Sequence, residues 1–129
     1  MPPQLTQAFP VLFVLDVKAS AEFFRDRLGF AIDFLHGQPP FYGSVSRGGA
    51  RIHLKFVHEP VLAVGPQDRE EFITVFIEVD DVEALFAEYN NAGVTLAQKL
   101  QTEAWGGRDF VVVGPDGNNL CFAQLLTDS

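Results

Sequence analysis

The segments Val11-Leu12-Phe13-Val14-Leu15-Asp16 and Val75-Phe76-Ile77-Glu78-Val79-Asp80 decide the fold, because they are two copies of one pattern. Each is an apolar run rich in β-branched residues that ends in Asp and leads into a helix-like segment. The helices are predicted over residues 19–28 and 81–92, and each stops at a glycine, the residue best suited to a left-handed helix cap. These two strand and helix pairs indicate an internal repeat.

The repeat keeps a constant register along the chain. Asp80 lies 64 residues after Asp16, and the two capping glycines keep the same offset. Farther along, Cys121 lies 68 residues after His53, which implies a four-residue insertion in the second half. Asp80 followed by Glu83 is typical of a capping box at the start of the second helix.

Three strand-like runs follow each predicted helix. They cover residues 31–35, 41–46 and 51–57 in the first half, and 94–100, 108–113 and 119–125 in the second. Arg47-Gly48-Gly49 and Pro115-Asp116-Gly117 supply turns between strands. Each half therefore has the order βαβββ.

The predicted fold is α+β, with two tandem βαβββ modules at about residues 7–58 and 71–126, joined by a linker at 59–70 within a single domain spanning 1–129. One helix cannot cover both faces of a four-stranded sheet. We therefore expect the two sheets to meet edge to edge in one curved mixed sheet around a cleft. Strand alternation would then place His53 and Cys121 opposite each other.

Composition limits the class of partner. The formal net charge is −8, from 17 acidic and 9 basic residues, which argues against nucleic acid and favours a cationic ligand. Thirteen Phe residues can supply both a core and the walls of a hydrophobic cleft. The sequence shows no leader pattern and no apolar run long enough to span a membrane, so we expect a soluble, cytoplasmic protein.

The chain resembles a known family in residues from both halves. Phe9 to Phe30 is similar to the opening module of the vicinal-oxygen-chelate superfamily, which contains glyoxalase I, extradiol dioxygenases and bleomycin-resistance proteins. Within it, the resemblance is greatest to the bleomycin-binding proteins. It is carried by Pro10-Val11-Leu12, Arg51-Ile52-His53-Leu54, Phe76-Ile77-Glu78-Val79, Trp105-Gly106-Gly107-Arg108-Asp109-Phe110 and Pro115-Asp116-Gly117-Asn118.

The resemblance implies a lost metal site. Metal-binding members of the superfamily place one His or Glu on each of four strands, and those positions fall here on Phe9, His53, Thr74 and Cys121. Phe has no lone pair to donate, Thr is a poor ligand, and two remaining donors are fewer than a catalytic site normally uses. We therefore expect no metal and no cofactor, and glyoxalase or dioxygenase chemistry does not carry over.

The predicted site is one for ligand binding, with no catalytic residue. Its members are Trp105, His53, Phe9, Thr74, Cys121, Phe41 and Phe110. Three of them have a competing interpretation: Trp105 could fill the core, His53 could be a satisfied core histidine, and Cys121 could be a nucleophile or a buried thiol. Arg108 and Asp109 could pair with one another or contact the ligand.

The sequence predicts a metal-independent protein that sequesters an aromatic, antibiotic-like ligand, with a cation favoured by the acidic balance. The resemblance also implies a homodimer with an exchanged N-terminal strand, and Pro10 suits a strand edge or start. One alternative is an enzyme, either a glyoxalase-like lyase or isomerase with an atypical site or a metal-free variant that uses His53 as general base. Another is an interaction protein whose cup is filled by its own side chains.

Overall fold

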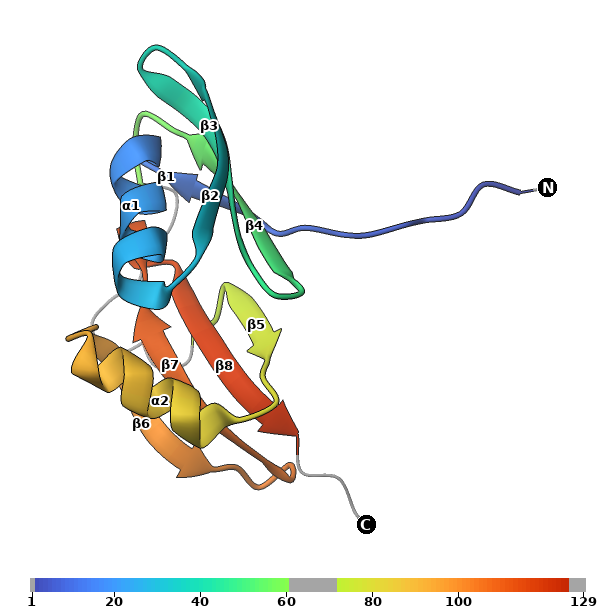
Figure 1. The fold of residues 1–129 in the computed structure, drawn as a ribbon, viewed down its shortest axis with the longest axis vertical. Coiled ribbons are helices and arrows are strands. Elements are labelled where there is room, and N and C mark those ends of the chain that lie inside the picture. Colours follow the sequence, from blue (N-terminus) through green and yellow to red (C-terminus); the bar gives the residue numbers. More distant parts are fainter. Residues whose placement is uncertain (1, 61–71, 126–129) are drawn as a thin grey trace.

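The computed structural model describes residues 2–60 and 72–125 (Figure 1). The first module contains β1 (Val11–Val14), α1 (Val17–Leu28), β2 (Ala31–Gly37), β3 (Pro40–Arg47) and β4 (Ala50–Phe56). The second contains β5 (Val75–Glu78), α2 (Val82–Asn91), β6 (Leu96–Thr102), β7 (Gly107–Val113), a short 3-10 turn at Pro115–Gly117 and β8 (Asn119–Leu125). The α+β class and the two tandem βαβββ modules are confirmed, while most of the predicted linker lies outside the described residues.

Each module forms its own four-stranded mixed sheet. The strand orders are β1-β4-β3-β2 and β5-β8-β7-β6, and the first strand of each module runs parallel to the last. In the described part of the chain β1 and β5 do not pair, so the expected edge-to-edge joining of the two sheets within one chain does not occur. Within residues 2–60 and 72–125, both strands are therefore sheet edges, and an uncovered sheet edge pairs readily with another chain.

The two helices begin and end where local chemistry favours it. The carboxylate of Asp16 accepts a hydrogen bond from the Ala19 backbone N–H at 2.9 Å, and Gly29 ends α1 with a φ of 75°. For α2 the predicted capping residue was wrong by one position, because Asp81 and not Asp80 accepts the bond from the Ala84 N–H at 3.1 Å. Within the described ranges, neither helix is long and apolar enough to cross a membrane.

A continuous hydrophobic core joins the two modules. Its second-module part is an aromatic cluster in which Tyr89 and Phe110 both contact Phe122, at centroid distances of 5.3 and 5.4 Å. The buried Tyr89 hydroxyl donates a 2.8 Å hydrogen bond to the Leu28 carbonyl of the first module. Burial raises the pKa of Tyr89 to about 12, so the phenol stays protonated and keeps donating.

The turn that contains Asp116 and Asn118, in the second module, forms hydrogen bonds to the backbone at the end of β1 in the first module. Asp116 adopts the left-handed region with a φ of 56°, and its carboxylate accepts a 2.8 Å hydrogen bond from the Leu15 N–H. The buried Asn118 amide donates to the Phe13 carbonyl at 3.1 Å and to the Pro115 carbonyl at 2.8 Å. The Pro-Asp-Gly-Asn segment therefore fastens one module to the other.

Asn118→Ala is expected to lower the free energy of unfolding by about 2 kcal/mol, because both hydrogen bonds are lost and the Phe13 carbonyl loses a partner. Urea denaturation followed by circular dichroism measures the loss. Asn90→Ala, an exposed change on α2, is the control and should shift the midpoint little. Equal effects of the two substitutions would contradict the fastening role.

Candidate functional site

Each sheet is covered by a helix on one face, which leaves the other face without a helix. On the second sheet, the centre of that other face is still buried, at Val111, Cys121 and Ala123. Along β4, Ile52 and Leu54 are buried in the core, whereas the alternate residues Arg51, His53 and Lys55 point to the opposite face. We define the first open face by Phe9, Phe34, Tyr42, Arg51, His53 and Lys55. We define the second open face by Phe76, Glu78, Glu103, Trp105, Asp109 and Cys121.

On the first open face, aromatic rings surround His53. Phe9 stacks on the imidazole at 5.2 Å between centroids, while Phe34 and Tyr42 approach it edge-on at 6.1 and 5.4 Å. The Tyr42 hydroxyl and His53 Nδ1 form a 2.8 Å hydrogen bond. This bond fixes the ring orientation and leaves Nε2 as the nitrogen without a protein partner among the described contacts.

A carboxylate beside His53 is already satisfied by its neighbours. Asp33 accepts hydrogen bonds from the hydroxyls of Ser44 at 2.8 Å and Ser46 at 2.6 Å. Burial opposes the charge, yet the two hydroxyls, helped by Arg51, keep the pKa of Asp33 below its usual value. Asp33 is therefore ionised at neutral pH, and its carboxylate is hydrogen-bonded to the neighbouring strand β3.

The second open face carries a pair of exposed aromatic rings. Trp105 lies in the β6–β7 turn with its ring centroid 6.4 Å from that of Phe76, and the two side chains are 51% and 54% exposed. The interpretation of Trp105 as a core residue is therefore wrong. Sequence reasoning missed Phe76, although the alternation in β5, with Val75 buried and Phe76 exposed, could have identified it.

The same face carries a buried carboxyl group, which Cys121, the cross-strand partner of Phe76, contacts. Asp109 accepts a 2.6 Å hydrogen bond from the Gln98 amide, and the Cys121 thiol donates to it at 3.7 Å. Burial, together with nearby Glu103, raises the pKa of Asp109, although Gln98 opposes the shift. Burial and Asp109 also raise the pKa of Cys121 to about 12, so the sulfur is a neutral thiol and is unsuited to be a nucleophile.

The predicted ligand-binding residues do not form one cluster. Phe9 and His53 meet on the first open face, and Trp105 and Cys121 belong to the second. His53 and Cys121 do not face each other, because each contacts partners from its own module. The Thr74 hydroxyl is buried and has no hydrogen-bond partner in the described part of the chain.

Two further residues of the predicted site, Phe110 and Phe41, lie away from both open faces. Phe110 is fully buried against Phe86 and Tyr89 of α2, so its assignment to the ligand site is wrong. Phe41 is 52% exposed beside His36, near the turn of the β2–β3 hairpin.

Arg108 and Asp109, which follow Trp105 in the sequence, contact different partners. Arg108 forms an ion pair with Glu83 of α2, whereas Asp109 bonds to Gln98 and Cys121. The two residues therefore do not pair with one another.

The residues at the superfamily's four metal positions do not fit a metal ion. Phe9 offers no donor atom and stacks on His53, and the Cys121 sulfur holds its proton. Among the described residues, no three His, Cys, Asp or Glu side chains converge on one point. We therefore derive no chemistry through a metal in this chain.

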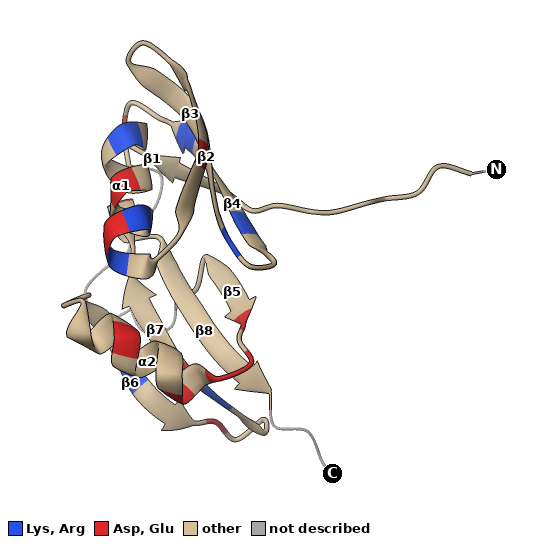
Figure 2. Cartoon of the chain, in the orientation of Figure 1, with Lys and Arg blue, Asp and Glu red and all other residues tan. Residues whose placement is uncertain are grey.

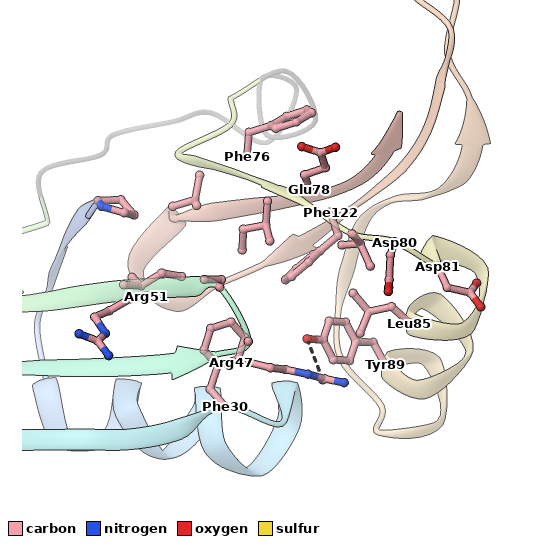
Figure 3. A pocket seen from close by; sticks show the side chains of 18 of the residues that line it. Phe30, Arg47, Arg51, Phe76, Glu78, Asp80, Asp81, Leu85, Tyr89 and Phe122 are labelled. Carbon is pink, nitrogen blue, oxygen red and sulfur yellow. Dashed lines mark hydrogen bonds between the residues drawn. The ribbon is translucent and has the colours of Figure 1, made fainter. Parts of the chain in front are cut away.

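A groove of about 810 Å³ separates the two modules (Figure 3). Its apolar floor includes Phe30, Leu85 and Phe122, and the open edge of β5 forms one wall. Arg47 spans the groove from the β3–β4 turn and binds Glu88 at 2.7 Å. Phe76 and Glu78 of the second open face also line the groove, at the opposite side from Leu85 and Tyr89 in Figure 3.

Comparison with known proteins identifies the family. Residues 6–122 match the model of the glyoxalase/bleomycin resistance protein/dioxygenase superfamily, and the chain belongs to that superfamily. A bleomycin resistance protein of Geobacillus stearothermophilus is 29% identical over 133 aligned positions, covering 95% of this chain and 98% of that protein. One of Staphylococcus aureus matches equally well.

Solved structures agree with this placement. The bleomycin-binding protein of bleomycin-producing Streptomyces verticillus, solved with copper(II)-bleomycin, has a TM-score of 0.73 and 26% identity, over 98% of this chain and 100% of that one. A glyoxalase-related enzyme from Clostridium phytofermentans shares the fold, with a TM-score of 0.76, 20% identity and coverage of 96% and 98%. The fold therefore occurs in both binding proteins and enzyme-related proteins.

Asp109→Asn should make the protein more stable at neutral pH. Because the pKa of Asp109 is raised in the folded state, its ionisation opposes folding as the pH rises through that pKa, whereas at acid pH the carboxyl is protonated and the penalty disappears. Thermal unfolding should show a gain of a few degrees at pH 7 and none at pH 4. Asp26→Asn, at an exposed carboxylate, is the control and should give no gain at pH 7. A gain for Asp109→Asn that is the same at both pH values would contradict this cause.

Proposed function

We propose that the protein binds and sequesters an aromatic, cationic small molecule, in the manner of a resistance protein, without chemically changing it. The observation that carries the proposal is the exposed pair of Trp105 and Phe76 on the same face as buried Asp109. Two exposed rings of this kind can hold a planar group between or upon them. Relatives named as bleomycin resistance and bleomycin-binding proteins support this choice.

The charge of the second open face favours a cation. Glu78, Glu103 and Asp109 lie on this face, and Figure 2 shows acidic residues at the end of β5 and in the segment that leads into α2. Arg108, the nearest cation in sequence, points to α2 and pairs with Glu83. A positively charged ligand would meet complementary carboxylates here, and tight binding would keep a toxic compound away from its target by mass action.

A titration with metal-free bleomycin tests this proposal. Because Trp105 is the only tryptophan, quenching of its fluorescence reports on one place. We expect saturable quenching with a submicromolar midpoint, corresponding to binding stronger than about −8 kcal/mol. If the fluorescence does not change and calorimetry detects no heat of binding, bleomycin is not the ligand.

Trp105→Ala should weaken the binding of metal-free bleomycin by about 30-fold, as expected for an aromatic anchor worth about 2 kcal/mol. Calorimetry measures the affinity, because the variant has no tryptophan. Phe56→Ala is the matched control: it removes a partly exposed ring from β4 that does not belong to either open face. Equal losses in the two variants would show that Trp105 is not the anchor.

We further propose that the protein is a homodimer with exchanged N-terminal arms. The N-terminal arm before Ala8 extends away from the rest of the chain in Figure 1, and its Leu5 is 100% exposed. An exposed arm without a packed contact among the described residues is poorly ordered unless another chain covers it. The open edges of β1 and β5 and the groove beside Pro10 offer it a place on a partner.

Light scattering after size exclusion should give twice the 14.3 kDa mass of the chain. Deleting residues 2–8 should shift the population toward monomer, because the arm's contacts with the partner are lost. The isolated arm touches little in its own chain, so circular dichroism should show that the truncated protein still folds. A full-length protein that is monomeric at micromolar concentration would refute the dimer.

A further inference from the structure

We propose that protonation of a carboxyl pair, Asp109 and Glu103, sets the position of Trp105. The β6–β7 turn stays docked while the two carboxyls share one proton, and it opens when both are charged. Trp105 is half of the ring pair at the proposed ligand site, so this device would switch that site between a formed and an open state. In that respect the inference rests on the proposed function, although the switch itself is measurable without a ligand.

The two carboxyl groups meet where β6 ends and β7 begins. Asp109 lies on β7 opposite Gln101 of β6, and Glu103 directly follows β6. Asp109 is 7% exposed, and its carboxyl forms a hydrogen bond with that of Glu103. Such a bond requires that one of the two groups carries a proton, because two carboxylates have only acceptor oxygens. The docked turn is therefore the form with one shared proton.

The groups that face Asp109 from the neighbouring strands are neutral or acidic. Gln98 of β6 donates a 2.6 Å hydrogen bond, and the neutral Cys121 thiol of β8 donates at 3.7 Å. Glu78 of β5 pairs with Ala123, which in turn pairs with Asp109, so a further carboxylate lies on the same face. Among their described residues, these strands supply hydrogen bonds to Asp109 but no ion-pair partner.

Within residues 2–60 and 72–125, no ion pair neutralises Glu103 either. Gln101 donates a hydrogen bond to its carboxylate, and Arg108, the residue before Asp109, forms its ion pair with Glu83 of α2. When the shared proton leaves, two like charges therefore face each other at a site where burial strengthens their repulsion. Burial, and after it the nearby Glu103, accordingly raise the pKa of Asp109.

The backbone of the β6–β7 turn connects this repulsion to Trp105. The Glu103 N–H donates to the Gly107 carbonyl at 2.7 Å, and the Gly106 N–H donates to the Glu103 carbonyl at 3.1 Å, so Glu103 holds the turn at two points. The indole of Trp105 packs on Gly107, where an added Cβ would overlap the ring. Movement of Glu103 away from Asp109 therefore displaces the indole.

Acrylamide quenching of Trp105 fluorescence tests the switch, since the chain has one tryptophan. In the ligand-free protein we expect one transition between about pH 4 and about pH 9, in which quenching rises as the shared proton leaves. Because the docked side chain is 51% exposed, the rise should be about twofold. Far-UV circular dichroism should stay constant, because the helices and strands do not melt. Constant quenching over this range, or quenching that rises only with a loss of dichroism, would overturn the proposal.

Two amide variants and a control identify the groups that titrate. Asp109→Asn and Glu103→Gln each replace one carboxyl by an amide that can donate to the other, so the turn should remain docked and the transition should disappear. Asp26→Asn, at an exposed carboxylate of α1, should keep the wild-type transition. A transition that survives in either amide variant overturns the proposal. Failure of bleomycin to bind would refute the proposed function without altering the pH response of Trp105, whereas a missing pH response refutes only the switch.

Discussion

One helix covers one face of each four-stranded sheet, and this constraint shapes the rest of the molecule. The covered faces supply the core that joins the modules, through Tyr89 and its hydrogen bond to the Leu28 carbonyl. The side chains on the uncovered faces must either be stable in contact with water or be covered by a bound molecule or another chain. These faces carry exposed rings, Trp105 and Phe76 on one and Phe9 and Phe34 on the other. The exposed rings on these two faces are thus accessible to a ligand.

The two open faces differ in charge and in their buried polar groups. The first places Arg51 and Lys55 around an imidazole held by Tyr42, and the second places buried Asp109 on the same face as its rings. The fold is shared with a glyoxalase-related enzyme, yet Phe9, at one of the positions that the resemblance assigns to a metal ligand, has no donor atom and stacks on His53. Function in this chain therefore follows from the side chains on the sheets.

The order of helices and strands could be predicted because the internal repeat and period-2 alternation are local patterns. Alternation failed for Phe110, because β7 is buried on both faces and neighbouring Val111 is as inaccessible as Phe110. The separation of the two sheets could not be foreseen, since edge pairing depends on how the modules dock. Tyr42 and Phe34 could not be predicted as neighbours of His53. Which residues lie opposite each other depends on the register between paired strands, and the sequence of one strand does not fix that register.

The central claim is that the open sheet faces are the binding surfaces of this protein. Chemical-shift mapping with metal-free bleomycin tests it most directly, because every backbone and indole N–H reports separately. The account predicts that the largest changes fall on the open faces, at the Trp105 indole and at Phe76 above all. Changes confined to the outer surfaces of α1 and α2, or the absence of any change at saturating ligand, would contradict it.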